Sequence, residues 1–356
     1  AHAWDFEVAD SEGSTYKDNG LKREDFYCYG LPVLAPAAGR VVSVVNDVPD
    51  NAVGQVNSED NWGNVVIIAH RGGLYSLLAH LAPDSIDVEV GTNVQPGTVV
   101  GRVGASGRAP TPHLHFQVQR TSEIGGPTVP AQFIHYVHLA GNKQSYVTRG
   151  VPKEGMVLRS LVTDRTRALA AAFPLGMTWS YEVTSGSERW IEQWQSQIDF
   201  LGNRSIECKR TKARLGLIVD DCSLITGPME SLGLTGLTWF SFAVPRLPFT
   251  ENNVSWQDYL PADNFLTRPK QVVHDFLEPF CSLASIKTIS RYLPAASFAI
   301  ETKMHFEGAL LDEHSIKIIA HFAKGRGLVN MRVSQGEKDL CQIQLQQMTG
   351  DEKNAQ

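Results

Sequence analysis

Residues 112–118 read Pro-His-Leu-His-Phe-Gln-Val, and the segments around them indicate the fold and the chemistry of the first third of the chain. In a β-strand, residues two apart project to the same face, so His113 and His115 can converge on one point. Such a pair suits a site in which one imidazole binds a metal and the other handles a proton. A bare His-x-His is also typical of a polar strand face, so the neighbouring segments have to decide between the two.

The segments upstream predict more strands. Residues 65–70 and 74–80 are apolar runs that flank Arg71-Gly72-Gly73, which is typical of a β-hairpin. Residues 101–107 then provide a glycine-rich approach to the His-x-His strand. No helical period competes here, so we expect an antiparallel, β-sandwich-like domain.

An acidic residue and a third histidine complete the pattern. Asp5 interrupts an apolar, strand-like run between Trp4 and Phe6, and His80 ends the second strand of the hairpin. A catalytic zinc site needs three protein ligands, commonly carboxylates and imidazoles, and an open position for water. We therefore expect Asp5 and the histidines to meet on facing strands.

The ordered series of motifs resembles the lysostaphin-type (LytM-like) peptidases, which include zinc-dependent cell-wall endopeptidases with a compact antiparallel β fold. The resemblance covers residues 1 to about 120, and its most specific part is Pro-His-Leu-His-Phe at residues 112–116. Its motifs are Asp-Phe (5–6), Gly-x-Pro-Val-x-Ala-Pro-x-x-Gly-x-Val (30–41), Gly-Asn-x-Val-x-Ile-x-His (63–70), Tyr-Ser-x-x-x-His-Leu (75–81) and Gly-x-Ser-Gly-Arg-x-x-x-Pro-His-Leu-His-Phe (104–116).

The resemblance implies one zinc ion per chain, bound by Asp5 and His115, with His80 and His113 as the catalytic histidines beside a water molecule. Zinc lowers the pKa of bound water and polarises the scissile carbonyl. A neighbouring imidazole can take a proton from the water, and another can donate one to the leaving amine. Which histidine takes which part is left open.

The third ligand departs from the family pattern. The family places a histidine four residues before the aspartate, and Ala1 occupies that position here. His2 lies three residues before Asp5, and an odd spacing puts two side chains on opposite faces of a regular strand. His2 can join the site only through a bulge or an irregular start of the strand. The alternative is a ligand upstream of Ala1.

The remaining histidines are expected to have structural roles. His70 is interpreted as a residue at the rim of the site. The others are interpreted as surface or capped core residues: His135, His138, His274, His305, His314 and His321.

The second half predicts a β-rich mixed accessory domain with a few helices. Residues 298–306 alternate apolar and polar side chains, as do residues 341–345, and this period is typical of half-buried strands. A short helix is expected at 164–173 and another, packed on the sheet, at 271–283. The adjacent Asp220 and Asp221 would face opposite ways in a strand.

Composition excludes some classes of protein. The 356 residues, 42% of them hydrophobic and 20% charged, predict two domains, at 1–145 and 150–348. The net charge of -6 without a basic stripe argues against nucleic-acid binding. No apolar stretch approaches the length of a membrane span.

The cysteines and the start of the chain give little information on disulfide bonding or cellular location. The five cysteines form no Cys-x-x-Cys pair, and Cys208 and Cys222 could form a disulfide or stay free. The sequence begins at Ala1, which indicates a processed product or a fragment, so no targeting segment can be read from it.

These observations predict a zinc endopeptidase that hydrolyses peptides of bacterial peptidoglycan outside the cytoplasm. The alternative is a non-catalytic member of the same fold that regulates other cell-wall hydrolases. A glycan-binding carrier or adhesion protein is a third hypothesis. The accessory domain is a candidate surface for a protein partner.

Overall fold

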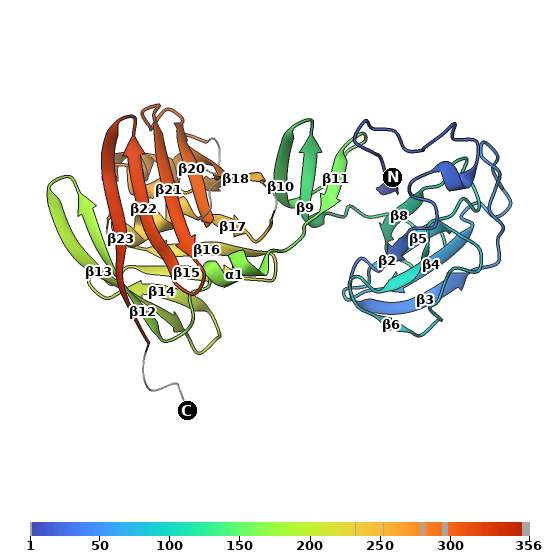
Figure 1. The fold of residues 1–356 in the computed structure, drawn as a ribbon, viewed down its shortest axis with the longest axis horizontal. Helices are drawn as coiled ribbons and strands as arrows, with labels where there is room; N and C mark the ends of the chain where they lie inside the picture. Colours follow the sequence, from blue (N-terminus) through green and yellow to red (C-terminus); the bar gives the residue numbers. More distant parts are fainter. Residues whose placement is uncertain (1, 232, 252, 279–281, 294–297, 351–356) are drawn as a thin grey trace. The chain divides into compact units, whose positions relative to one another are not determined.

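The computed structural model describes residues 2–231, 233–251, 253–278, 282–293 and 298–350. The chain divides into two compact units, Ala1–Gln132 and Phe133–Gln356. The limits of 1–145 and 150–348 stay a prediction; the hairpin formed by residues 133–150 belongs to the second unit. Strands dominate both units, as the sequence predicts (Figure 1).

Unit 1 contains a six-stranded antiparallel sheet and a smaller two-stranded sheet. The strand order in the larger sheet is β1-β8-β5-β4-β3-β6, and β2 pairs with β7 in the smaller one. The elements are β1 (Ala3–Phe6), η1 (Arg23–Asp25), β2 (Pro32–Leu34), β3 (Gly39–Val45), β4 (Asn64–Ala69), β5 (Tyr75–Leu81), β6 (Asn93–Val94), β7 (Val99–Arg102) and β8 (Leu114–Gln119).

The core of unit 1 lies on its central hairpin. Val65 and Ile67 of β4 pack with Leu77 and Ala79 of β5, and all four side chains are fully buried. Both faces of these central strands are covered, which explains why their sequences are continuous apolar runs. The pairing of β4 with β5 confirms the expected hairpin.

Unit 2 is built on one fifteen-stranded sheet. Its order is β11-β9-β10-β18-β19-β20-β21-β22-β23-β12-β13-β14-β15-β16-β17. The strands are β9 (Phe133–Ala140), β10 (Lys143–Gly150), β11 (Val157–Ser160), β12 (Met177–Ser185), β13 (Glu188–Ile198), β14 (Arg204–Cys208), β15 (Arg214–Val219), β16 (Ser223–Glu230), β17 (Arg246–Pro248), β18 (Ser255–Leu260), β19 (Ser285–Tyr292), β20 (Phe298–Glu307), β21 (Ser315–Ala323), β22 (Gly327–Gln335) and β23 (Lys338–Gly350).

One pairing in this sheet differs from the rest. Strand β10 runs parallel to β18, and the only residues in register there are Ser145 and Ser255. The other strand pairs of the sheet are antiparallel. The strands β9, β10 and β11 are thus joined to the rest of the sheet by a short parallel contact.

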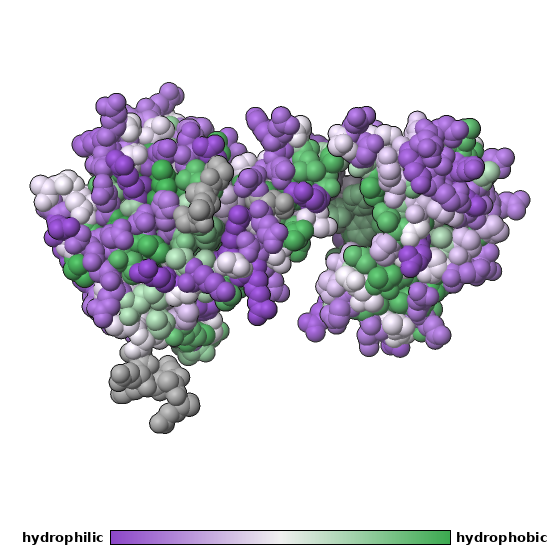
Figure 2. All heavy atoms as spheres, in the orientation of Figure 1, coloured by the Kyte–Doolittle hydropathy of each residue, from purple (hydrophilic) through white to green (hydrophobic). Residues whose placement is uncertain are grey.

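The helices of unit 2 are short. They are α1 (Arg165–Ala170), α2 (Gly236–Ala243), η2 (Asp263–Phe265) and α3 (Arg268–Leu277). Among the described residues, no helix is long and apolar enough to cross a membrane. In Figure 2, hydrophilic side chains cover much of the visible face of each unit.

Helix α2 lies in the core of unit 2. All eight of its residues are buried, and it packs against the neighbouring strands β15 and β16 and against β21, which lies well away from them in the strand order. Glu192 of β13 is fully buried and accepts hydrogen bonds from Gly236 N at the start of α2 and from Trp194 Nε1. The sheet therefore curves around this helix.

One of the sequence expectations for this unit needs correction. The expected helix at 271–283 begins earlier, at Arg268, and ends at Leu277, and none of its residues is buried. Residues 279–281 lie outside the described residues. Of the two possibilities that the sequence left open for Cys208 and Cys222, the structure has the free thiols.

Candidate active site

The pairing of β1 with β8 brings the first two candidate residues together. Asp5 lies directly opposite His115 in the antiparallel register, and side chains in that relation are neighbours. Asp5 Oδ1 is 2.7 Å from His115 Nδ1. On the other side of β8, His115 is opposite Ala79, so His80 follows at the end of β5.

His80 is held as a neutral base. Its Nδ1 is 2.9 Å from the carbonyl oxygen of Ser106. Because a carbonyl can only accept, Nδ1 carries the hydrogen, and Nε2 is left with its lone pair. Burial, followed by the charges of His113 and His115, lowers the pKa of His80 to about 4. At neutral pH this ring can accept a proton.

Two glycines allow the Ser106 loop to reach His80. A Cβ on Gly63 would lie 2.3 Å from Ser106 Oγ, and one on Gly107 would lie 2.4 Å from Gly63 N. Both glycines have positive φ values, of +58° and +75°. Ser106 Oγ also donates to the carbonyl of Leu81 at 2.7 Å. The glycine-rich motif thus places one backbone carbonyl against the ring.

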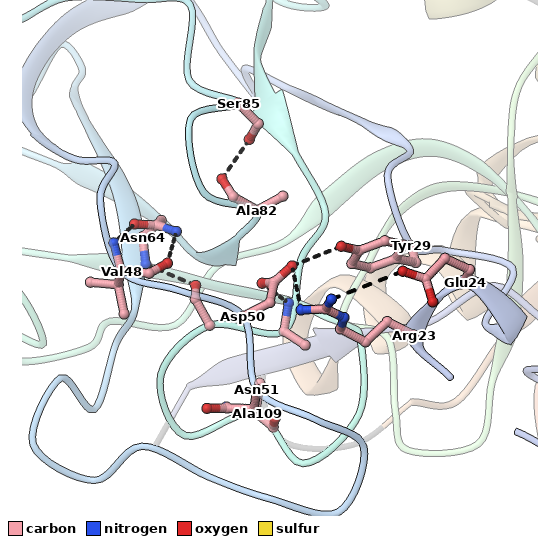
Figure 3. Close-up of polar contacts among 12 residues, drawn as sticks. Arg23, Glu24, Tyr29, Val48, Asp50, Asn51, Asn64, Ala82, Ser85 and Ala109 are labelled. Carbon is pink, nitrogen blue, oxygen red and sulfur yellow. Dashed lines mark hydrogen bonds and ion pairs between the residues drawn. The ribbon is translucent and has the colours of Figure 1, made fainter. Parts of the chain in front are cut away.

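Polar side chains brace the same loop from a second direction (Figure 3). Asp50 Oδ1 accepts a hydrogen bond from Ala105 N at 2.7 Å, and its Oδ2 accepts one from Tyr29 Oη at 2.9 Å. Asn51 Nδ2 donates to the carbonyl of Ala109 at 3.2 Å. The loop that carries Ser106 is therefore anchored on both sides of that residue.

A chain of amides determines which nitrogen of His115 is free. Gln119 Nε2 donates to the carbonyls of Thr121 and Glu123, at 2.7 and 2.6 Å. Its Oε1 therefore accepts from Gln117 Nε2 at 2.7 Å, and Gln117 Oε1 faces His115 Nε2 at 3.1 Å. Since that oxygen can only accept, His115 Nε2 carries a hydrogen, which leaves Nδ1 as the nitrogen that faces Asp5.

The contact of His115 with Asp5 requires a positive charge. In the neutral ring, the lone pair of Nδ1 would face a carboxylate oxygen at 2.7 Å. A proton on Nδ1 satisfies the contact, and its hydrogen bond is the main cause of the lowered pKa of Asp5. A zinc ion would also satisfy it if the two atoms separated to about 3.3 Å, the spacing of tetrahedral ligands. The donor set fits such an ion.

His113 completes the cluster. Its Nδ1 is 2.9 Å from the carbonyl of Thr111, and its Nε2 is 3.8 Å from Asp5 Oδ1. Its ring lies 4.9 Å from that of His80, between centroids, with an interplanar angle of 62°. The ring of Trp62 lies edge-on to that of His115 at 5.1 Å.

These side chains line one cavity of about 490 Å³. Its lining residues are Asp5, Glu7, Asn61, Trp62, His80, Arg108, Pro110, Thr111, His113 and His115. Four of the five residues predicted from the sequence are thus brought together, and their roles stay a prediction.

The fifth predicted residue, His2, is not among the lining residues of the cavity. Its side chain is exposed, and its backbone N–H donates to Thr128 Oγ1 at 3.1 Å. Its role as third ligand stays a prediction, and Ala1 lies outside the described residues. His70 also lies outside the cavity lining, with its ring bonded to Ala38 O and Ser76 Oγ.

Sequence reasoning missed the glutamines that orient His115. Gln117 and Gln119 are 2% and 0% exposed. The available signal was spacing, because His115, Gln117 and Gln119 occupy every second position of β8, and His113 precedes them at the same spacing.

Fold and site together define a β-sheet domain with a histidine–carboxylate cluster of the kind found in metal-dependent hydrolases. Residues 22–127 match the family described as Peptidase family M23. The chain therefore contains a peptidase family M23 domain.

Similar proteins share this part of the chain. The cell division protein DipM of Caulobacter vibrioides is 33% identical over 101 residues, which are 28% of this chain and 14% of DipM. The DD-carboxypeptidase/endopeptidase Mpg of Neisseria meningitidis serogroup B is 38% identical over 66 residues, 18% of this chain and 15% of Mpg. The match thus spans about one seventh of the length of each relative.

A solved structure of a putative peptidase M23 from Pseudomonas aeruginosa is 35% identical to the matched part of this chain. The match covers 26% of this chain and 35% of that one, with a TM-score of 0.21.

Proposed function

We propose that unit 1 is a zinc endopeptidase that cleaves peptide bonds of bacterial peptidoglycan outside the cytoplasm. The family and the name of the relative Mpg, a carboxypeptidase/endopeptidase, support the reaction class. The observation that supports the metal is the position of His115 Nδ1, which Gln117 and Gln119 direct toward Asp5 Oδ1, so that one ion could bind both atoms. Asp5 and His115 would hold one zinc ion, with His2 or a residue upstream of Ala1 as third ligand.

The chemistry that zinc supplies at such a site is polarisation of a scissile carbonyl and of a water molecule. His80 Nε2, neutral at pH 7, accepts the proton of the attacking water. His113 donates through Nδ1 to the carbonyl of Thr111, so its Nε2 can donate to the leaving amine or to the developing oxyanion only after the ring has taken up a second proton. Trp62 and Arg108 of the cavity wall would contact the peptide on either side of the scissile bond.

The test is release of peptide amines from purified peptidoglycan by the full chain. We expect activity that EDTA removes and zinc restores. His113→Ala should lower kcat by 10²–10⁴-fold, the usual contribution of a positioned acid or base. His70→Asn, in the same unit but outside the cavity, is the matched control and should stay within about twofold of the parent chain. Activity that survives both EDTA and His113→Ala would contradict the proposal.

One observation favours a non-catalytic alternative, in which the domain regulates other cell-wall hydrolases. His2 lies outside the cavity lining, so Asp5 and His115 are the metal-binding side chains from the sequence pattern that the cavity contains. In that case the chain would bind peptidoglycan without releasing amines, and unit 2 would provide the surface for a protein partner. Zinc content separates the two, since the enzyme requires a metal that Asp5→Asn removes.

A further inference from the structure

A second cluster of metal-ligand side chains lies in unit 2. His135 of β9 meets Asp220 and Cys222 of the turn between β15 and β16. One nitrogen, one oxygen and one sulfur atom from these residues all lie within 4.8 Å of one another. The cluster is partly buried, with His135 and Cys222 half-buried and Asp220 exposed.

Only one carboxylate oxygen of Asp220 accepts hydrogen bonds from the backbone of the turn. Oδ1 accepts hydrogen bonds from Cys222 N at 2.8 Å and Ser223 N at 2.6 Å. The second oxygen, Oδ2, is 3.8 Å from His135 Nε2. That distance is too long for a hydrogen bond. It is close to the separation of about 3.3 Å between two ligands of one tetrahedral ion.

His135 is oriented from its other side. Its Nδ1 is 2.7 Å from Tyr146 Oη, on the neighbouring strand β10. Histidines that bind metals nearly always donate the second ring N–H to a fixed oxygen, which sets the tautomer and frees the first nitrogen. With the hydrogen on Nδ1, the lone pair of Nε2 is available on the side of Asp220.

We propose that His135, Asp220 and Cys222 bind a divalent transition-metal ion of the zinc class. Imidazole and thiolate ligands favour zinc over magnesium or calcium, which prefer oxygen ligands only. Three protein ligands leave a fourth position for water or another donor. The ion would join β9 to the β15–β16 turn, two segments that the sheet order places far apart.

The test uses the full chain loaded with Co²⁺, because a thiolate bound to cobalt gives a charge-transfer absorption band. Among the described residues, the lining of the candidate active site contains no cysteine. The second potential cluster found there in unit 2, formed by Asp263, His274 and Asp275, contains none either. We expect one thiolate–cobalt band per chain. The band should disappear in Cys222→Ser. In Asp220→Asn and His135→Ala, the affinity for cobalt, measured by titration of the band, should fall at least tenfold.

Two matched controls keep the assignment specific. Asp221→Asn alters the adjacent carboxylate, which is not part of the cluster, and should leave the band unchanged. Asp5→Asn alters the candidate active site and should also leave it unchanged. Circular dichroism in EDTA checks that each variant folds. A parent chain without the band, or a band that persists in folded Cys222→Ser, would overturn the proposal.

Discussion

His80 and His135 both adopt left-handed backbone conformations, with φ values of +62° and +52°. Such values are uncommon for residues other than glycine and cost of the order of 1–3 kcal/mol. In both cases Nδ1 meets a fixed oxygen, that of Ser106 or of Tyr146. In His80 the carbonyl leaves Nε2 as the acceptor, which suits a base; in His135 the Tyr146 hydroxyl can accept from Nδ1, and that tautomer leaves Nε2 for the proposed metal.

Burial of His80 predicts a loss of stability in acid. The unfolded pKa is 6.5 and the folded pKa is about 4, so between these values only the unfolded chain binds the proton. The free energy of unfolding is therefore fully retained above pH 6.5 and falls as the pH drops toward 4. At about 1.4 kcal/mol per pKa unit, the loss is on the order of 3 kcal/mol. Denaturant unfolding in EDTA, from pH 7 to 4.5, measures it.

The control for this prediction is His80→Asn, which can still donate to Ser106 O but does not titrate. Its stability should be lower at pH 7 and should vary less between pH 6.5 and 4.5. An equal acid dependence in the parent and in His80→Asn would assign the effect to other groups.

The amide chain behind His115 predicts a second effect. Gln117→Met keeps the size of the side chain but removes the acceptor from His115 Nε2. Zinc affinity of the active site should fall 10–100-fold, the usual effect of losing such a partner. Competition with a chelator measures it, in a chain that carries Cys222→Ser so that only one site is counted.

Gln95→Met is the matched substitution for this experiment, because Gln95 is an exposed glutamine of the same unit outside the cavity lining. If Gln95→Met lowers the affinity for zinc as much as Gln117→Met does, the role given to the amide chain is wrong.

Residue spacing could predict part of the site. The strand period predicts that His113 and His115 project to one face. The order of the family motifs predicts that this segment pairs with the neighbouring strands. The orientation of His115 could not be predicted, because it depends on the carbonyls of Thr121 and Glu123, which a turn brings back to Gln119. His135 and Asp220 could not be paired either, because their contact depends on a left-handed residue and a turn.

At the level of elements, the glycine-rich loops predict a difference between two alanine substitutions. Gly63 and Gly72 both have positive φ, so alanine costs each about 1 kcal/mol. A Cβ at Gly63 would also lie 2.3 Å from Ser106 Oγ, whereas none of the atoms around Gly72 is within 4 Å. We expect Gly63→Ala to lower the free energy of unfolding by about 1–3 kcal/mol more than Gly72→Ala.

Denaturant unfolding of the two variants gives this difference, and peptidase activity gives a second readout. Gly63→Ala should lower activity as well, since it displaces the carbonyl that holds His80. Equal stabilities would mean that the loop relaxes without cost.

Strands were easier to predict than helices. The alternating side chains of β20 and β23 follow the strand period, and the sheet confirms them. Helix α2 gave no amphipathic signal, because it is apolar all round and buried on every side. The sequence of helix α3 has a helical period, but its apolar side chains are not buried: Val272 and Phe276 are 69% and 75% exposed. Periodicity indicates a helix, and only tertiary contacts decide which face is covered.

For the whole molecule, the separate cores of the two units predict two unfolding transitions by calorimetry. The unfolding temperature of each unit should rise when that unit binds its metal ion, because an ion at one hundred times its Kd stabilises the folded state by about 2.7 kcal/mol. In Asp5→Asn, EDTA should shift only the transition of unit 2, and in Cys222→Ser only that of unit 1. A single transition, or identical shifts in both variants, would contradict this assignment.

The short parallel contact between β10 and β18 has a consequence for how unit 2 opens. A region whose backbone pairs with its sheet only at Ser145 and Ser255 has few ladder hydrogen bonds to break when it opens, and the long antiparallel ladders beyond it stay paired. Backbone amides of β9, β10 and β11 should then exchange their hydrogens with deuterated water earlier than those of β20 to β23. An ion between His135 and Asp220 would add a second link, from β9 to the β15–β16 turn, so its removal should speed exchange in these three strands first.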